Sequence, residues 1–122
     1  INRRQRGITT AQQAMRDVSK GLSPTMRAGK VQQKAARAGY AFPEAEDALQ
    51  AVRNAAVKVG EMMNRKRDPE KALGEMLFDA VNATRLCGKS ADIALNEAID
   101  RFIDRFSTAE TATNAAKNAP NT

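Results

Sequence analysis

Apolar residues recur at helical spacing along most of the chain, and no stretch alternates convincingly as a β-strand. Three stripes step by three and four residues, and a helix must bury such a stripe to be stable. We therefore predict an all-α fold, an antiparallel helical bundle of four to five helices. The predicted core contains Leu49, Val52, Val59, Leu73, Leu77, Val81, Leu95, Ile99 and Phe102.

Capping residues and helix breakers divide these stripes into elements. Ser23-Pro24 is typical of a helix start, and Gly39 suits the end of the same helix. Asp68 is a candidate N-cap for a helix that Gly88 ends, and Ser90 is a candidate cap for the next helix. Near the amino end, Thr9 or Thr10 is a candidate cap for a short helix that runs to Lys20, after a basic arm. The turn after the fourth helix is short, so we expect the last two helices to pair antiparallel.

Composition excludes several classes of chemistry. The chain has no histidine, so His-based triads, His metal ligands and His general bases are excluded. One cysteine excludes an intramolecular disulfide and a cysteine cluster for zinc. No apolar run is long enough to span a bilayer and no signal peptide is visible, so we expect a cytoplasmic protein without a membrane partner.

The 122 residues have a formal net charge of +6 and a pI of about 9.9. A basic balance permits attraction to nucleotides, nucleic acid or acidic surfaces. Arg27, Lys30, Lys34 and Arg37 follow one another at helical spacing and form a basic ridge. Such a ridge is either a solvated helix face or an edge that faces phosphate groups.

Two separated blocks of sequence resemble a known family. The first reads Pro24-x-Met26-Arg27-Ala28-x-Lys30-Val31-Gln32 and ends in Gly39-Tyr40-x-Phe42-Pro43. The second reads Leu77-Phe78-x-x-Val81-Asn82-x-x-Arg85, then a Gly-Lys turn, Ala91-x-Ile93-Ala94-Leu95 and Arg101-Phe102-x-x-Arg105-Phe106. Together they resemble a MazG domain, from its opening helix and Gly-Phe-Asp-Trp-Pro turn to its C-terminal half. The family comprises all-α nucleoside triphosphate pyrophosphohydrolases, which convert NTP and water to NMP and pyrophosphate.

The resemblance implies a division of the chain into three parts. Residues 1–21 are expected to be an N-terminal arm and short helix, and residues 22–106 a MazG-like helical domain. Residues 107–122 are rich in Ala, Thr and Asn and are expected to be a flexible tail that begins as fraying helix.

The resemblance also implies where metal-binding carboxylates would lie. MazG domains hold Mg²⁺ with Glu-Glu-x-x-Glu on one helix and Glu-x-x-Asp on a facing helix, spacings that place the side chains on one helix face. Without gaps, the first motif falls on Asn54, Ala55 and Lys58, and the second on Ala72 and Glu75. Only Glu75 has a carboxylate. Glu61 and Asp79 are the available substitutes, so a residual metal set would be Glu61, Glu75 and Asp79.

The residues expected to bind the substrate match the MazG pattern better than the metal ligands do. The resemblance places phosphate- or nucleotide-binding residues at Arg27, Lys30, Asn82, Arg101 and Arg105. An Arg side chain fits phosphate through its planar fork of donors. The alternative for Arg101 and Arg105 is ordinary surface ion pairing with Asp100 and Asp104.

Three functions are compatible with these residues. The first, which the motif losses favour, is a MazG-like domain that is catalytically impaired and serves nucleotide binding, assembly or regulation. The second is an active, Mg²⁺-dependent pyrophosphohydrolase with displaced or partner-supplied carboxylates. The third is a basic helical domain that binds nucleic acid, although its basic residues occur on several helices. In the first two, a homo-oligomer is expected.

Overall fold

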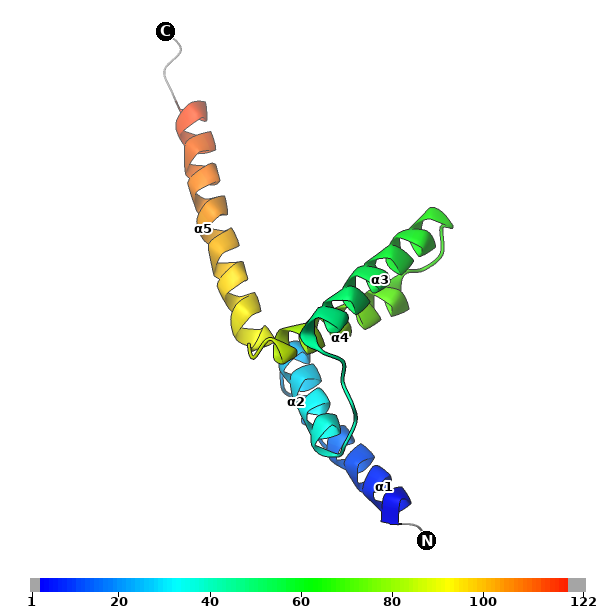
Figure 1. Cartoon of the computed structure of the whole chain (residues 1–122). Coiled ribbons are helices and arrows are strands. Elements are labelled where there is room, and N and C mark those ends of the chain that lie inside the picture. The colour runs from blue at the N-terminus through cyan, green and yellow to red at the C-terminus, as the bar shows by residue number, and fades with distance from the viewer. Residues whose placement is uncertain (1–2, 119–122) are drawn as a thin grey trace. The chain divides into compact units, whose positions relative to one another are not determined.

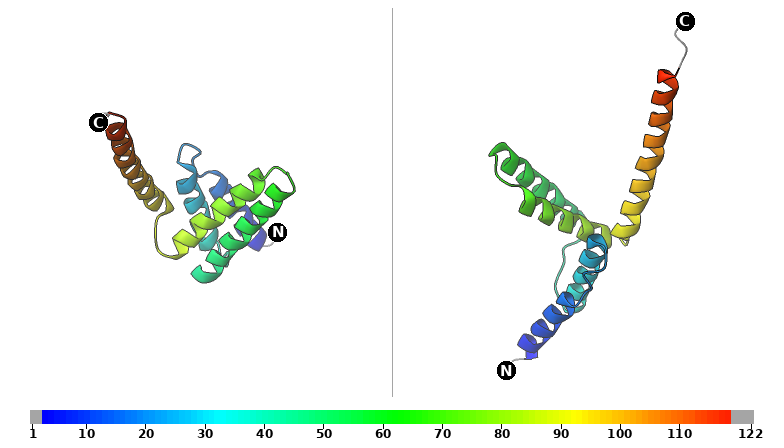
Figure 2. Two further views of the ribbon diagram at one scale, coloured as in Figure 1. Left: turned by 90° about the horizontal axis from the view of Figure 1, so that it is seen from above. Right: turned by 180° about the vertical axis from the view of Figure 1, so that it is seen from behind.

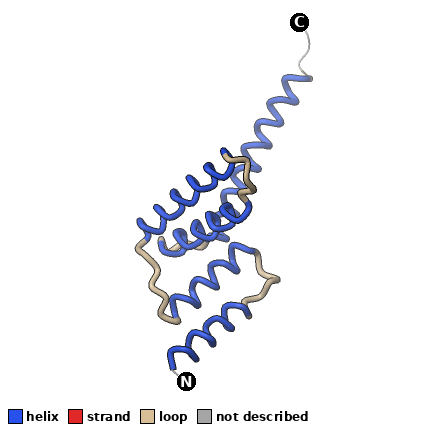
Figure 3. Tube along the Cα trace, turned by 90° about the vertical axis from the view of Figure 1, so that its right-hand side faces the viewer, coloured by secondary structure: helices blue, strands red, loops and turns tan. Residues whose placement is uncertain are grey.

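The computed structural model describes the backbone of residues 3–118, and the side chains of 10–108 and 110–118. The described part of the chain is helical and contains no strand (Figure 3). The all-α prediction is therefore confirmed. Figure 1 labels the five helices: α1 Arg3–Arg16, α2 Pro24–Arg37, α3 Ala45–Asn64, α4 Glu70–Leu86 and α5 Ala91–Lys117.

The chain divides into two compact units, Ile1–Ala91 and Asp92–Thr122, which we describe separately. In the first unit, α3 and α4 form a hairpin of helices that lie side by side, and α2 packs against α4 (Figure 2). α1 packs in turn against α2. The second unit consists of the greater part of α5. None of the described helices is both long and apolar enough to cross a membrane.

The predicted helix boundaries are largely confirmed. The Ser23 hydroxyl accepts a hydrogen bond from the Met26 N–H at 3.3 Å, as an N-cap of α2 should. Gly39 and Gly88 have φ values of 99° and 74°, the left-handed conformation that commonly follows a helix end. The cap of α4 lies one residue later than predicted, because Pro69 and not Asp68 occupies the N-cap position. The Asp68 carboxylate nevertheless accepts from the Glu70 N–H at 3.0 Å, so it satisfies one free donor at the start of α4.

The first helix differs from the prediction. It begins at Arg3 and ends at Arg16, whereas the sequence indicated a basic arm followed by a helix from Thr9 or Thr10 to Lys20. Arg and Gln are good helix formers, so the amino-terminal residues extend the helix instead of interrupting it. The end comes early because the Val18 N–H turns to the Met15 carbonyl at 3.2 Å, a tighter turn than the α-helix.

The predicted core is partly wrong. Val59 and Val81 are buried and Val52 is half-buried, but Leu49, Leu73 and Leu77 are exposed. Ala48, Ala72 and Ala83 are buried instead, so small side chains fill most of the core of the first unit. A close approach of helices requires small residues, and the larger apolar side chains then lie on the outer faces.

The apolar stripe of α5 is also exposed. Leu95, Ile99 and Phe102 were predicted to be core, but each is exposed, and Phe102 retains 60% of its accessible surface. Within residues 92–118, which the structure describes, the second unit is a single helix, and no second element of that unit covers this stripe. Amphipathic periodicity identified the stripe correctly, but periodicity does not determine whether another part of the chain covers it.

A tight turn joins α3 to α4. Lys66 has a φ of 54°, and within the described part of the chain no other residue except glycine has a positive φ. The Lys66 N–H donates to the Met63 carbonyl at 3.0 Å, and the Arg67 N–H donates to the Met62 carbonyl at 2.9 Å. These two bonds satisfy carbonyls at the end of α3 in the manner of a Schellman turn.

Candidate functional site

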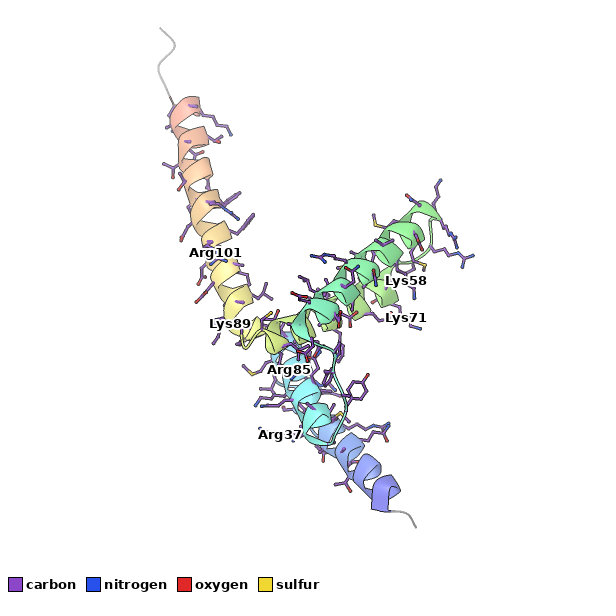
Figure 4. All side chains as sticks on the ribbon, in the orientation of Figure 1. Arg37, Lys58, Lys71, Arg85, Lys89 and Arg101 are labelled. Carbon is purple, nitrogen blue, oxygen red and sulfur yellow. The ribbon has the colours of Figure 1, made fainter. Side chains whose placement is uncertain are left out.

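The positions predicted to correspond to the metal motifs of a MazG domain lie on the α3–α4 hairpin. Ala72 is 6% exposed and Ala55 is half-buried, whereas Asn54 and Lys58 are exposed on α3. The side-chain oxygen Oδ1 of Asn54 accepts a hydrogen bond from the side-chain Nε2 of Gln50 at 3.0 Å, within α3 itself. Figure 4 shows Lys58 on α3 and Lys71 on the neighbouring α4, so this hairpin presents cations on both helices.

These residues do not fit a magnesium ion. Mg²⁺ requires oxygen ligands in near-octahedral geometry, and an alanine side chain has no donor atom. Among the residues whose side chains are described, no three carboxylate or cysteine groups gather where they could hold a metal. Glu61, Glu75 and Asp79 therefore do not form such a group, and the ammonium of Lys58 would repel a cation at the position of a ligand.

A polar contact lies in the interface between α2 and α4. Gln32 is 1% exposed, and its amide nitrogen donates to the backbone carbonyl of Phe78 at 3.0 Å. Its carbonyl oxygen is buried and has no hydrogen-bond partner. A Cβ atom added to Gly29 would lie 3.9 Å from a methyl group of Val81, an ordinary contact distance, so the two helices approach closely one turn away.

A second polar cluster, which sequence reasoning missed, lies at the end of α4. Arg85 donates to the side-chain oxygen of Asn82 at 2.9 Å, and its guanidinium carbon lies 4.6 Å from the centre of the Phe42 ring. The Phe42 ring is 4.6 Å from the ring of Tyr40. This cluster fastens the segment between α2 and α3 to α4. The spacing of Asn82 and Arg85, three residues apart on one helix, was the signal available in the sequence.

The predicted phosphate-binding residues occur in both units. Arg27 and Lys30 lie on α2; Arg27 is half-buried with an enclosed Nε that has no partner, and Lys30 is exposed. Asn82 is 8% exposed, and its oxygen is already engaged by Arg85. Arg101 and Arg105 are exposed on α5. A role of these five residues in ligand binding stays a prediction.

Comparison with known proteins adds a distant relationship. The chain is similar to nucleoside triphosphate pyrophosphohydrolase of Escherichia coli. The two are 27% identical over 121 residues, which cover 90% of this chain and 43% of the relative. The proteins of strain K12 and strain O157:H7 match equally well. No protein-family model matches the sequence.

The chain thus spans less than half the length of the curated relatives it matches. The similarity extends through nearly the whole chain, including both blocks of sequence that resemble a MazG domain. It supports a relationship to nucleoside triphosphate pyrophosphohydrolases, and the all-helical architecture agrees with it.

Proposed function

We propose that this chain is a MazG-like domain that binds a nucleoside triphosphate or a similar phosphorylated ligand but hydrolyses it poorly or not at all. The family reaction is release of pyrophosphate from a nucleoside triphosphate. What supports the impairment is the composition of the α3–α4 hairpin, where Ala55, Lys58 and Ala72 stand at the positions that the ungapped placement assigns to the carboxylates of a MazG domain.

The physical reason is the loss of charge stabilisation. In a MazG domain, bound divalent metal neutralises charge on the phosphates and helps to generate the attacking hydroxide. In this chain, Glu75 is the one carboxylate left at the predicted motif positions to hold the metal, and Lys58 adds a positive charge to the same helix pair.

The residues proposed to bind the ligand are basic or amide side chains. Arg101 and Arg105 lie one turn apart on α5, and both are exposed, so their guanidinium groups are accessible to phosphate oxygens. Arg27, Lys30 and Asn82 are the proposed contacts from the first unit. In this proposal, the domain serves nucleotide binding, assembly or regulation.

The first experiment measures pyrophosphate release by the purified chain across a panel of nucleoside triphosphates, with Mg²⁺ and with a chelator. We expect no release above the chelated control. Robust release that the chelator abolishes would support the alternative, an active enzyme with displaced or partner-supplied carboxylates. Glu75→Ala would then test whether the remaining acid takes part.

The second experiment measures nucleotide binding by isothermal titration calorimetry. We expect binding by the parent and a loss of at least about tenfold in Arg101→Ala/Arg105→Ala, since two charge-assisted contacts are removed. The matched control is Arg65→Ala/Arg67→Ala, which removes two exposed arginines from the turn between α3 and α4. Equal losses in both variants, or no binding by the parent, would overturn the proposed binding function.

A further inference from the structure

The basic charge of this protein is concentrated in its first two helices. Residues 1–39 contain nine Lys or Arg residues and one acid, Asp17. The other 83 residues contain eleven basic and thirteen acidic residues, so they are slightly acidic as a group. Because α1 packs against α2, this excess belongs to one structural element, which we call the α1–α2 hairpin.

Three residues of the basic ridge along α2 are available to a partner, whereas Arg27 is half-buried; from here on, the α2 ridge means these three. Lys30, Lys34 and Arg37 are exposed and follow one another at spacings of four and three, which places them on neighbouring turns of one helix face. Asp17 is hydrogen-bonded to Gln13 at 2.9 Å. Among the described side chains, no ion pair neutralises the three cations of the ridge. Like charges at this spacing destabilise an isolated helix, and an anionic partner removes that repulsion.

An exposed aromatic ring follows the ridge. Gly39 turns the chain with φ of 99°, and Tyr40 comes next with 64% of its surface exposed. The Tyr40 N–H donates to the Ala35 carbonyl at 3.0 Å, and the Tyr40 ring rests against Phe42 at 4.6 Å. Phe42 is held in turn by Arg85. Tyr40 therefore follows Arg37, the last residue of α2, by three positions, and its backbone is tied to the end of that helix. Figure 4 labels Arg37 on α2.

We propose that the α2 ridge and Tyr40 form a binding surface for single-stranded nucleic acid. Phosphates of the strand lie along Lys30, Lys34 and Arg37, and one unpaired base stacks on Tyr40. Cations that follow the backbone, together with an aromatic ring that accepts a base, are the combination by which proteins bind single strands without sequence preference. This surface consists of residues on α2 and the segment after it and includes none of the α3–α4 positions. Lys30 is shared with the proposed nucleotide contacts, whereas Lys34, Arg37 and Tyr40 are not, so the inference does not depend on the proposed nucleotide hydrolase ancestry.

Two competing partners are less suited to the surface. A base in a duplex is already stacked and paired, so it offers no free face to Tyr40. An anionic membrane binds amphipathic helices through a large apolar face beside the cations. Between Lys30 and Arg37, the exposed side chains are Gln33 and Lys34, and both are polar. The apolar residues in this stretch are half-buried, so the ridge has no large apolar face beside it.

The test is fluorescence anisotropy with a labelled thymidine oligonucleotide of roughly 15 nucleotides. Between about 50 and 200 mM salt, three phosphate contacts give a slope of about −2 in log K against log salt. We expect Lys30→Gln/Lys34→Gln/Arg37→Gln to bind at least tenfold more weakly and to flatten this slope. Arg53→Gln/Lys58→Gln/Lys71→Gln makes the same charge change at exposed positions of α3 and α4 and should alter both quantities little.

Tyr40 provides an independent measurement, because the chain has one tyrosine and no tryptophan. We expect the oligonucleotide to quench tyrosine emission, Tyr40→Phe to bind nearly as well as the parent, and Tyr40→Ala to lose at least about fivefold in affinity. Circular dichroism melting of both Tyr40 variants keeps a folding defect separate from a binding defect. The proposal is overturned by equal losses in the two glutamine variants or by absence of quenching. It is also overturned by tighter binding to the matching duplex, or to phosphatidylserine vesicles, than to the single strand.

Discussion

Gln32 shows how a single buried amide can stabilise a helix interface incompletely. Its nitrogen is paired with the Phe78 carbonyl, while its oxygen is enclosed without a partner. An unpaired buried acceptor costs roughly 1–3 kcal/mol, which equals or exceeds the roughly 0.5–1.5 kcal/mol that one hydrogen bond contributes. The side chain therefore acts chiefly by filling space between α2 and α4.

This account predicts opposite outcomes for two substitutions. Gln32→Met keeps the volume and removes the unpaired oxygen, so its free energy of unfolding should lie within about 1 kcal/mol of the parent. Gln32→Ala leaves a cavity and should cost roughly 2–3 kcal/mol. Urea denaturation measures both. A methionine variant as unstable as the alanine variant would show that the oxygen has a partner in solution.

Arg85 is the residue on which the segment between α2 and α3 depends. It contacts the Phe42 ring and the Asn82 oxygen at once. A double-mutant cycle with Arg85→Met and Phe42→Leu should give a coupling of about 0.5–2 kcal/mol, the range for a partly desolvated cation–π pair. Lys71→Met with Phe42→Leu is the control, because Lys71 lies fourteen residues earlier on α4, about 21 Å along the helix. Coupling near zero in both cycles would remove Arg85 from this role.

At the scale of elements, the sequence predicted helices better than it predicted their packing. Caps and glycines determine helix ends locally, so Ser23, Gly39 and Gly88 could be interpreted without a structure. The buried face of each helix was harder to predict, because the prediction chose large apolar residues and the buried residues include small alanines. Leu77 is 61% exposed, while Ala48 on α3 and Ala72 on α4 are buried. A stripe of leucines indicates that a helix has an apolar face, but it does not specify which element, if any, covers that face.

The candidate site was predictable only where one residue type decides the chemistry. The absence of an oxygen ligand at Ala55 and Ala72 is evident from the sequence, and the structure adds that Ala72 is enclosed. The cluster of Tyr40, Phe42 and Arg85 joins residues more than forty positions apart. No local pattern encodes such a contact, which is why sequence reasoning missed it.

The α3–α4 interface predicts a strong effect of an acid at position 72. Ala72→Glu places an unpaired carboxylate in the helix contact and should cost roughly 3–5 kcal/mol of unfolding free energy. Lys71→Glu, at the exposed neighbouring position, should change stability by about 0.5 kcal/mol or less. Chemical denaturation of the two variants checks this difference, and similar values for both would mean that Ala72 is accessible to water.

The same interface allows a test of where the family's metal site would lie. Asn54→Glu/Ala55→Glu/Lys58→Glu/Ala72→Glu/Glu75→Asp should be less stable than the parent without metal, since close carboxylates repel. Mg²⁺ or Mn²⁺ should raise its melting temperature, because metal bound only to the folded state stabilises that state. The parent should respond little. Equal metal-induced shifts in parent and variant would show that these five positions do not converge.

At the scale of the whole molecule, both units leave apolar side chains uncovered. Leu77 and Phe78 are exposed in the first unit, and Ile99, Phe102 and Phe106 are exposed in the second. Surfaces of this kind favour association, so we expect the chain to form homo-oligomers. Because Phe102 is exposed, Phe102→Ala should cost about 1 kcal/mol or less in dilute monomer, not the 3–5 kcal/mol of a buried aromatic.

Light scattering over a range of protein concentrations measures this association. The average mass of the parent should rise above that of a monomer, and Phe102→Glu/Phe106→Glu should lower it by removing the apolar stripe. Thr108→Glu/Thr111→Glu introduces the same two charges at exposed polar positions of α5 and should leave the mass unchanged. A parent that stays monomeric at every concentration contradicts the expectation.

The turn at Lys66 leaves this protein an easy route to greater heat resistance. A lysine in the left-handed conformation is strained by its Cβ, at a cost of roughly 1 kcal/mol, whereas asparagine adopts this conformation more readily. The Lys66 side chain is exposed, so exchanging it disturbs no buried contact. Lys66→Asn should raise the melting temperature by a few degrees, about 2–6 °C for a chain of this size, and Lys66→Val should lower it. An engineer who needs a more robust version of this domain can therefore begin at one position in a turn and leave every helix unchanged.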